Sequence, residues 1–280
     1  LTFPIFGVCL YLLFGRSGAV NIMRGRFTRT DTELQPHYAT PLDRAAMPQD
    51  PALQNQIHYL QTQAHYPACR NTDVTYYGDT NAALEAQKTD LRKAQHFIFM
   101  EYHAIEDSIA WQGIEDILAE RAAAGVEVRV FYDDMGSIGF VDTAFAKKLQ
   151  QRGIQCRVFN PIVPVLNVFM NNRDHRKITV IDGQVGYTGG YNLADEYFNL
   201  THPYGRWKDS GVRLEGDAVR GLTLIFLELW GATQKAAPEV ERYLPDVPYT
   251  ARENAVVLPY ADNPLDDEAT GENVYQIGRA

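Results

Sequence analysis

Short apolar runs and amphipathic stretches alternate through the middle of the chain, and this alternation constrains the fold more than any other feature. Runs rich in aromatic and β-branched residues, which favour strands, lie at 74–77, 96–102, 126–132 and 155–159. Stretches with apolar residues three and four apart, which favour helices, lie between them at 84–94, 108–124 and 141–151. This order predicts an α/β sandwich with a largely buried sheet.

The same kind of pattern continues toward the C-terminus. Strands are expected at 177–182 and 185–188, on either side of a turn at Gly183, and a short strand is expected at 212–214. A last amphipathic helix is expected over 218–233.

The composition is that of a globular protein without a general affinity for polyanions. Of 280 residues, 45 % are hydrophobic and 22 % charged, which is enough apolar material for a sizeable core. The 26 basic and 35 acidic residues give a formal charge of −9, which argues against nucleic acid as a partner. Cys9, Cys69 and Cys156 lie far apart and form no CxxC pair, so neither a zinc site nor a disulfide framework is expected.

Residues 1–14 form an apolar run without a charged side chain. At 1.5 Å per residue such a helix spans about 21 Å, short of the roughly 30 Å of a bilayer core. The run fits a signal-peptide core, a buried helix, or the end of a membrane helix that starts before Leu1, and we favour the last. Arg16, Arg24 and Arg26 follow it, and basic residues beside a membrane span prefer the cytoplasmic side. We therefore expect a protein of the cell membrane whose folded domain lies on the cytoplasmic side.

These patterns divide the chain into four segments. Residues 1–14 are expected to be a truncated transmembrane segment, and 15–56 a juxtamembrane connector without sustained period, in which a short helix fits. Residues 57–245 hold the α/β domain, and 246–280 follow it as a linker.

One stretch carries residue types that fit a chemical role: His175, Lys177, Asp182, Gly189, Gly190 and Asn192, in the pattern H-x-K-x4-D-x6-G-G-x-N. His175 and Lys177 are two apart on an extended segment, so both side chains face the same way while Ile178 faces the core. The glycines allow a turn and let backbone N–H groups approach an anion, and Asn192 adds an amide donor. A single strand histidine or a glycine pair is usually structural, but six specified positions in one pattern favour a phosphoryl site.

At these residues the chain resembles the phospholipase D superfamily, whose histidine–lysine–aspartate (HKD) motif has this pattern, and within it the bacterial cardiolipin synthases. Further stretches similar to that family lie at 11–16, 132–137, 172–178, 187–192, 195–197 and 207–209. The resemblance implies a phospholipase D-like α/β sandwich with a mixed sheet flanked by helices. It also implies a phosphatidyltransferase that makes cardiolipin from two phosphatidylglycerol molecules, without a metal or another cofactor.

The resemblance assigns roles to the motif residues. One histidine attacks the phosphodiester phosphorus, a second protonates the leaving alcohol, and an incoming alcohol resolves the phosphohistidine. His175 would be the nucleophile, and Lys177 and Asn192 would hold the non-bridging phosphate oxygens. Gly189 and Gly190 would bind the substrate beside them. The apolar stretch 159–171, next to the active strand, would either admit acyl chains or be covered by the rest of the protein.

The nucleophilic imidazole needs a partner for its second nitrogen, and two aspartates compete for this catalytic role. The resemblance points to Asp209, whose alternative is a surface carboxylate paired with a neighbouring cation. Asp182 is the motif's own aspartate, but strand parity places it on the face opposite His175. We therefore assign Asp182 a structural role at the end of the strand.

One departure from the family concerns its second motif, because members carry two HKD motifs whose histidines share one site. The other histidines of this chain are not followed by a lysine two positions later: His37, His58, His65, His96, His103 and His202. The tail at 266–280 is similar to 79–94, so 246–280 is expected to be a linker and the start of a second repeat. We expect an isolated monomer to be nearly inactive until it meets the missing half or a homodimer partner, with His202 as the first alternative acid.

Two other functions stay open. The chain fits a single-HKD phosphodiesterase, either a lipid hydrolase or a nuclease, that completes its site as a homodimer. It also fits an inactive membrane-tethered fragment. The charge of −9 counts against a nuclease.

Overall fold

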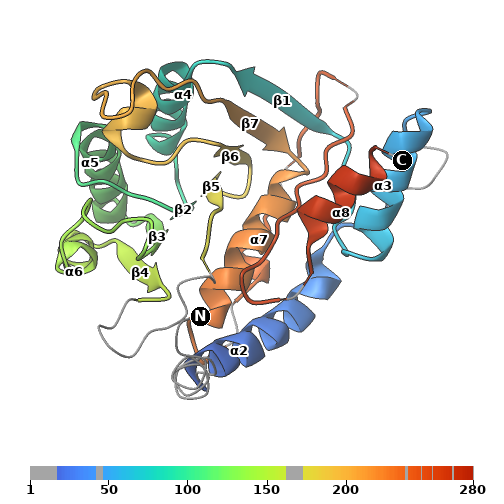
Figure 1. Cartoon of the computed structure of the whole chain (residues 1–280), viewed down its shortest axis with the longest axis horizontal. Helices are drawn as coiled ribbons and strands as arrows, with labels where there is room; N and C mark the ends of the chain where they lie inside the picture. The colour runs from blue at the N-terminus through green and yellow to red at the C-terminus, as the bar shows by residue number, and fades with distance from the viewer. Residues whose placement is uncertain are drawn as a thin grey trace, which may run out of the picture.

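A seven-stranded mixed sheet lies at the centre of the protein (Figure 1), in the order β1-β7-β6-β5-β2-β3-β4. The computed structural model describes residues 18–41, 47–161, 173–236, 239–246, 248–253, 255–266 and 268–279. Its strands are β1 Thr72–Tyr77, β2 Phe97–Tyr102, β3 Glu127–Asp133, β4 Gln155–Phe159, β5 Lys177–Ile181, β6 Val185–Gly189 and β7 Gly211–Gly216. Strands β2, β3 and β4 run parallel, whereas β5, β6, β7 and β1 pair antiparallel. The predicted α/β sandwich with a mixed, buried sheet is confirmed.

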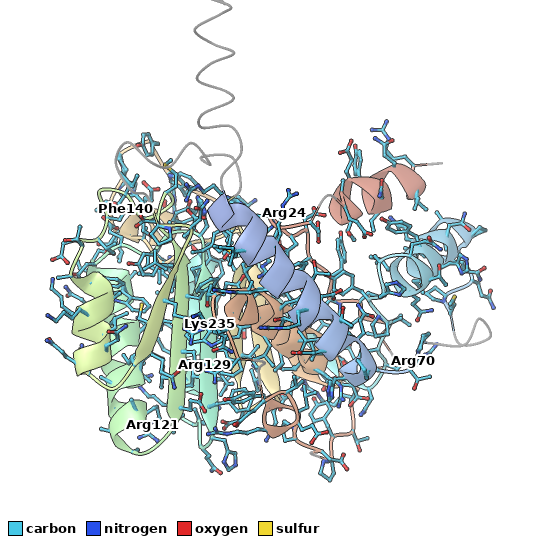
Figure 2. The ribbon with its side chains drawn as sticks, turned by 90° about the horizontal axis from the view of Figure 1, so that it is seen from below. Arg24, Arg70, Arg121, Arg129, Phe140 and Lys235 are labelled. Atoms are coloured by element: carbon cyan, nitrogen blue, oxygen red, sulfur yellow. The ribbon has the colours of Figure 1, made fainter. Side chains whose placement is uncertain are left out.

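Helices cover both faces of this sheet. Three of them, α4 Thr80–Leu91, α5 Ile109–Ala123 and α6 Phe145–Gln151, pack on one face, and α7 Val219–Ala232 packs on the other. Strand β2 shows how one sequence serves both layers, because Phe97 and Phe99 face α7 while Ile98 and Met100 face the other helices. On the α7 side, the guanidinium of Arg129, which is labelled in Figure 2, lies over a buried aromatic ring. Its carbon lies 5.1 Å from the centroid of the Phe99 ring.

Helix α2, Gly18–Leu34, corrects the expectation for residues 15–56. The short helix expected in this connector is instead a 17-residue helix that lies along α7 (Figures 1 and 2), and α3 Pro51–Thr62 begins before the segment ends. Thr30 and Leu34 of α2 are fully buried. A Cβ at Gly231 of α7 would lie 2.8 Å from Thr30 Oγ1, so a glycine admits the helix at this point. Packing against α7 therefore stabilises α2, whose weak hydrophobic periodicity does not predict a helix.

The C-terminal segment returns to the domain. Cys69 and Val257 exchange two backbone hydrogen bonds, at 2.8 and 2.9 Å. Helix α8, Thr270–Ile277, contacts α3, where Gln56 Nε2 donates to the carbonyl oxygen of Val274 at 2.9 Å. The start of a second repeat in this segment stays a prediction.

Two expectations fall wholly or largely outside the described residues: the membrane segment at 1–14 and most of the apolar stretch at 159–171. Within the described ranges, no helix combines the length and the apolar character that crossing a bilayer requires.

Candidate active site

The candidate site lies at one edge of the sheet, where five strands begin or end. Tyr102 at the end of β2 pairs with Lys177 at the start of β5, and it also pairs with Tyr132 near the end of β3. Gly189 at the end of β6 pairs with Gly211 at the start of β7. The segments that flank these pairs, among them 173–176 and 190–192, therefore meet at the same edge.

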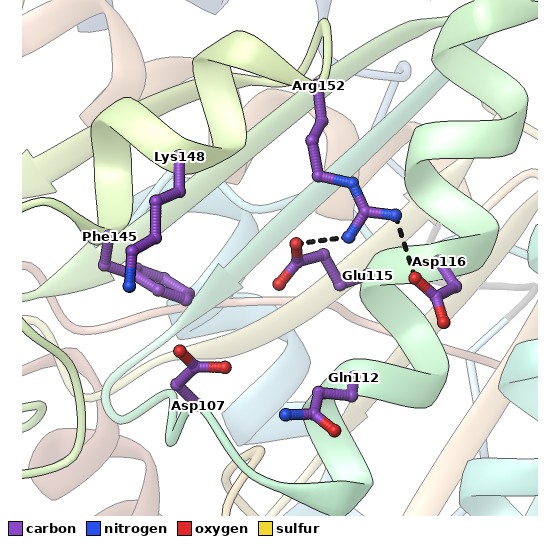
Figure 3. Close-up of a pocket in the computed structure, with 7 residues that line it drawn as sticks. All are labelled: Asp107, Gln112, Glu115, Asp116, Phe145, Lys148 and Arg152. Atoms are coloured by element: carbon purple, nitrogen blue, oxygen red, sulfur yellow. Dashed lines mark hydrogen bonds and ion pairs between the residues drawn. The ribbon is translucent and has the colours of Figure 1, made fainter.

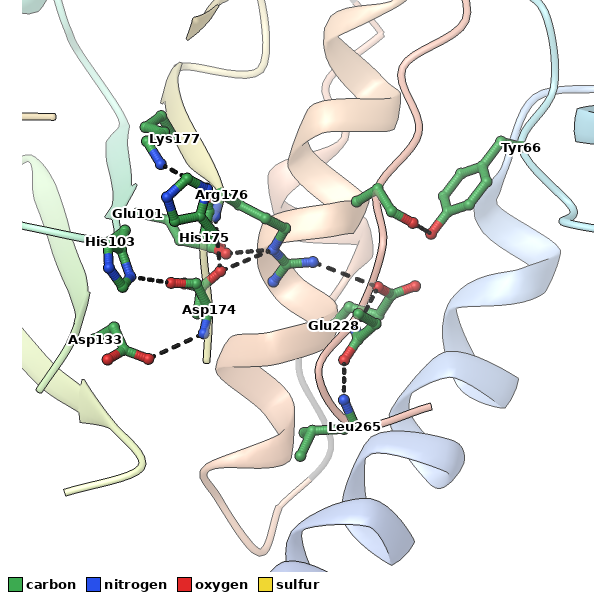
Figure 4. A network of polar contacts seen from close by, with 12 residues as sticks. Tyr66, Glu101, His103, Asp133, Asp174, His175, Arg176, Lys177, Glu228 and Leu265 are labelled. Carbon is green, nitrogen blue, oxygen red and sulfur yellow. Dashed lines mark hydrogen bonds and ion pairs between the residues drawn. The ribbon is translucent and has the colours of Figure 1, made fainter. Parts of the chain in front are cut away.

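His175 and Lys177 touch each other there. Lys177 Nζ donates to the His175 carbonyl oxygen at 2.7 Å and lies 3.2 Å from His175 Nδ1 (Figure 4). The His175 side chain is exposed, whereas Lys177 is buried with 5 % of its surface accessible. The prediction that the two side chains share one face is confirmed.

Their surroundings shift the pKa values of both groups downward. Burial lowers the pKa of Lys177 to about 8, although the carboxylates of Asp174 and Asp209 oppose this shift. Burial also lowers the pKa of His175, helped by the charges of Lys177 and His103 and opposed by Asp174. At neutral pH, His175 is therefore a neutral imidazole beside a cation. An ammonium group only donates, so the Lys177 contact makes Nδ1 an acceptor and leaves the imidazole proton on Nε2.

The residue before His175 is held at both of its backbone polar groups. Asp174 N donates to Asp133 Oδ2 at 2.9 Å, and the Asp174 carbonyl oxygen accepts a hydrogen bond from His103 Nδ1 at 2.6 Å (Figure 4). Arg173 donates to the other oxygen of Asp133 at 3.2 Å. These contacts fix the backbone from which the His175 side chain projects.

Arg176 points into the protein, opposite to its two neighbours. It pairs with Glu101 at 2.6 Å, with Asp174 at 3.4 Å and with Glu228 at 3.9 Å. All three carboxyl groups are buried. Burial raises the pKa of Glu101 well above its usual value and that of Glu228 to about 8, in both cases against the opposing charge of Arg176. The network anchors the start of β5 to α7 from beneath the site.

Asp182 lies at the other end of β5, in the left-handed backbone region at φ 52°. Its carboxylate accepts hydrogen bonds from the backbone N–H groups of Gln95, His96 and Phe97 at 2.7, 2.8 and 2.8 Å. It thereby ties the turn after β5 to the start of β2. These contacts agree with the structural role assigned to the motif's aspartate.

The two glycines of the motif leave space for the segment that precedes β7. A Cβ at Gly189 would lie 2.6 Å from the Ser210 carbonyl oxygen, and a Cβ at Gly190 would lie 2.8 Å from Asp209 Cγ. The Gly190 N–H already donates to the Ser210 carbonyl oxygen at 3.1 Å, so it is not free to approach an anion as expected. The glycines instead allow the segment before β7 to pack closely.

Asp209 and Asn192 lie near this edge without contacting His175 in the described part of the chain. Asp209 Oδ1 accepts from Ser210 N at 2.7 Å, and its charge raises the pKa of Lys177. Asn192 is buried; its Oδ1 accepts from Ala104 N at 3.1 Å, and its Nδ2 donates to the Tyr197 hydroxyl at 2.9 Å. The second N–H of the Asn192 amide makes no hydrogen bond among the described residues. Both predicted roles stay predictions.

Sequence reasoning missed His103, Asp133 and Asp174. His202, expected as the first alternative acid, is exposed on a loop, whereas the His103 ring lies next to that of His175. The sequence feature that could have identified His103 and Asp133 is their position directly after the ends of two expected strands. Functional side chains often lie at such positions.

Away from this edge, the described residues offer no metal site, and one cavity there is unrelated to the motif. Among the described residues, no group of three or more His, Cys, Asp or Glu side chains is arranged to hold a metal ion. A cavity of about 340 Å³ between α5 and α6 (Figure 3) is lined largely by charged side chains, including Arg152, which pairs with Glu115 at 2.5 Å. Because none of its lining residues belongs to the motif, it is separate from the candidate site.

Fold and site together define an α/β domain of the HKD type, with a histidine and a lysine presented at one edge of a mixed sheet. Residues 88–210 match the family model described as "Cardiolipin synthase, PLD-like domain". A cardiolipin synthase from Staphylococcus aureus is 34 % identical over 262 residues, which are 87 % of this chain and 51 % of that protein. An uncharacterized protein from Streptococcus mutans is 44 % identical over 210 residues, 75 % of this chain and 45 % of that one.

The chain belongs to the phospholipase D superfamily, as a cardiolipin synthase-like member. It spans about half the length of these curated relatives. Among solved structures it is similar to NucT from Helicobacter pylori, with a TM-score of 0.45 and 10 % identity over 57 % of this chain and 97 % of that one. That similarity is too distant to bear on function.

Proposed function

We propose that the protein transfers a phosphatidyl group between two phosphatidylglycerol molecules to make cardiolipin, and that this chain supplies the first half of the site. The observation that carries the proposal is the contact between exposed His175 and buried Lys177 at the edge of the sheet. The comparisons support the proposal, because the matched family model and the Staphylococcus aureus relative both bear the name cardiolipin synthase.

In the proposed mechanism, the anionic phosphodiester first attracts the Lys177 ammonium group. Lys177 then leaves His175 Nδ1, which can take the imidazole proton, with Asp209 as the proposed acceptor at that nitrogen. Nε2 is left with its lone pair and attacks phosphorus. The bond from phosphorus to the glycerol oxygen breaks, and that oxygen takes a proton from the general acid of the second half-site.

The second step reverses the first with a different alcohol. A hydroxyl group of the second phosphatidylglycerol attacks the phosphohistidine and loses its proton to the same acid–base group. The P–N bond to His175 breaks, and cardiolipin leaves. Lys177 and Asn192 hold the non-bridging oxygens throughout, since their charge persists during the transfer.

We further propose that the protein acts at the cytoplasmic side of the cell membrane, with phospholipid as substrate and without nucleic acid. The support is the apolar run at 1–14 and the three arginines that follow it. The second half-site would come from a further HKD repeat or from a homodimer partner.

The test uses vesicles of phosphatidylglycerol whose headgroup glycerol carries an isotopic label. The chain is assayed over a range of concentrations, alone and with a C-terminal half containing the second motif, and lipid products are analysed by mass spectrometry. We expect cardiolipin and one released glycerol per cardiolipin, lost in His175→Ala and kept in His202→Ala, whose side chain is exposed. Phosphatidic acid as the product would indicate a hydrolase, and no lipid turnover under any condition would contradict the proposal.

A further inference from the structure

His103 is the closest aromatic neighbour that the structure gives His175. The two imidazole rings have centroids 4.7 Å apart and are tilted by 51° (Figure 4). A carbonyl oxygen only accepts, so the 2.6 Å contact with Asp174 means that His103 Nδ1 carries a proton and donates it. His103 therefore touches both the ring of His175 and the peptide from which that ring projects.

The His103 ring is itself held in place. A Cβ at Gly136 would lie 2.7 Å from His103 Cε1 and Nε2, so the backbone of the loop after β3 packs directly on the ring. That loop is fixed by Asp133, whose Oδ1 accepts from Met135 N at 2.8 Å and from Gly136 N at 3.2 Å. On its other side, the residue after His103 donates its N–H to Asn192, a member of the motif. A ring held this firmly can in turn limit the positions of the ring beside it.

We propose that His103 is a positioning residue for His175, which it orients for attack through the hydrogen bond to the Asp174 carbonyl and through ring contact. The inference rests on the proposed function, in which His175 is the nucleophile. It places a second imidazole in the site within this chain, independently of the histidine that a second half would bring.

The charged groups around His175 add a second, electrostatic consequence. Lys177 and His103 lower the pKa of His175, and Asp174 raises it, while burial has the largest effect. Replacing His103 by an uncharged residue removes one of the lowering charges. The pKa of His175 should then rise, because one of the effects that lower it is removed.

Two substitutions separate the hydrogen bond from the ring. His103→Asn places an amide N–H near the position of Nδ1 and keeps the donor to the Asp174 carbonyl, but it removes the ring and its charge. His103→Phe keeps a ring against His175 and removes the donor and the charge. His202→Asn serves as the matched control at an exposed histidine.

The first readout needs no catalysis. Diethyl pyrocarbonate modifies unprotonated imidazole, and peptide mass spectrometry follows the modification of His175 as a function of pH in each variant. We expect the pH midpoint for His175 to rise in both His103 variants and to stay unchanged in His202→Asn. An unchanged midpoint in both His103 variants would overturn the electrostatic part of the inference.

The second readout is the rate at which the phosphatidyl group appears on His175. We expect His103→Phe to slow this step by about 10- to 100-fold, the range that a misplacement of about 1 Å can cause, and His103→Asn to recover most of the rate. Equal, wild-type rates in both variants would overturn the positioning role. If the wild-type chain transfers no phosphatidyl group, the proposed function fails, while the modification profile still decides whether His103 acts on His175.

Gly136→Ala provides an independent perturbation if His103→Phe does not fold. The added Cβ would clash with the His103 carbonyl oxygen and would lie 2.7 Å from His103 Cε1 and Nε2, so it would displace both the backbone and the ring of His103. The positioning role predicts slower transfer to His175 per folded molecule of Gly136→Ala, and a wild-type rate per folded molecule would contradict it.

Discussion

Asp182 offers a sharp test of the roles within the motif, because it accepts three backbone hydrogen bonds far from the reacting histidine. A hydrogen bond to a charged group contributes about 1.5–3 kcal/mol. Gln95 and His96 are exposed, so water replaces the carboxylate at those two amides, whereas the N–H of buried Phe97 would lose its partner. Asp182→Ala should therefore lower the free energy of unfolding by about 3 kcal/mol.

Asp182→Asn refines the same test. The amide oxygen can still accept from two of the three N–H groups, while its NH₂ group faces the third donor. We expect a loss of about 2 kcal/mol in the free energy of unfolding. The assay is denaturant unfolding followed by fluorescence, with Asp116→Asn as the control, since its exposed pair with Arg152 contributes little. The transfer rate per folded molecule should stay near wild type. Wild-type stability with lost transfer would refute the structural assignment.

Further predictions concern the rate of phosphatidyl transfer. Because the pKa of His175 is lowered, its neutral form persists on acidification, and the acid limb of the rate profile should lie below the ordinary imidazole value of 6.5. Because the pKa of Lys177 is about 8, the rate should fall as the pH rises through 8, and Lys177→Arg should move that limb to higher pH. Gly190→Ala should slow transfer by at least about 10-fold at nearly unchanged unfolding free energy, because its Cβ would displace Asp209; a wild-type rate would contradict this. Turnover should increase more than in proportion to chain concentration unless the second half is supplied, and concentration-independent activity of a monomer would argue against a shared site.

The sheet could be predicted from the sequence because local composition reports burial. Strands β2, β3 and β5 are buried on both faces, and their aromatic and β-branched runs reflect this directly. Helix α2 could not be predicted, since its sequence is largely polar and its stability depends on contacts with α7, which is almost 200 residues away in sequence.

The site divides in the same way. The shared face of His175 and Lys177 follows from strand pleating, which is a local rule. The proximity of His103 depends on the antiparallel pairing of β2 with β5, a long-range choice that no local pattern reveals. The buried ion pairs of Arg176 could not be predicted either, because Glu101 and Glu228 come from elements that are far apart in the sequence.

In the proposed mechanism, His175 carries the phosphatidyl group during transfer. The most direct measurement is to mix the chain and its second half-site with phosphatidylglycerol, quench within one turnover, and locate the bound lipid phosphate by peptide mass spectrometry. We expect a phosphatidyl adduct on the peptide that contains His175, and we expect it to be absent in His175→Ala. An adduct on another residue, or cardiolipin formation by the His175→Ala chain, would contradict it.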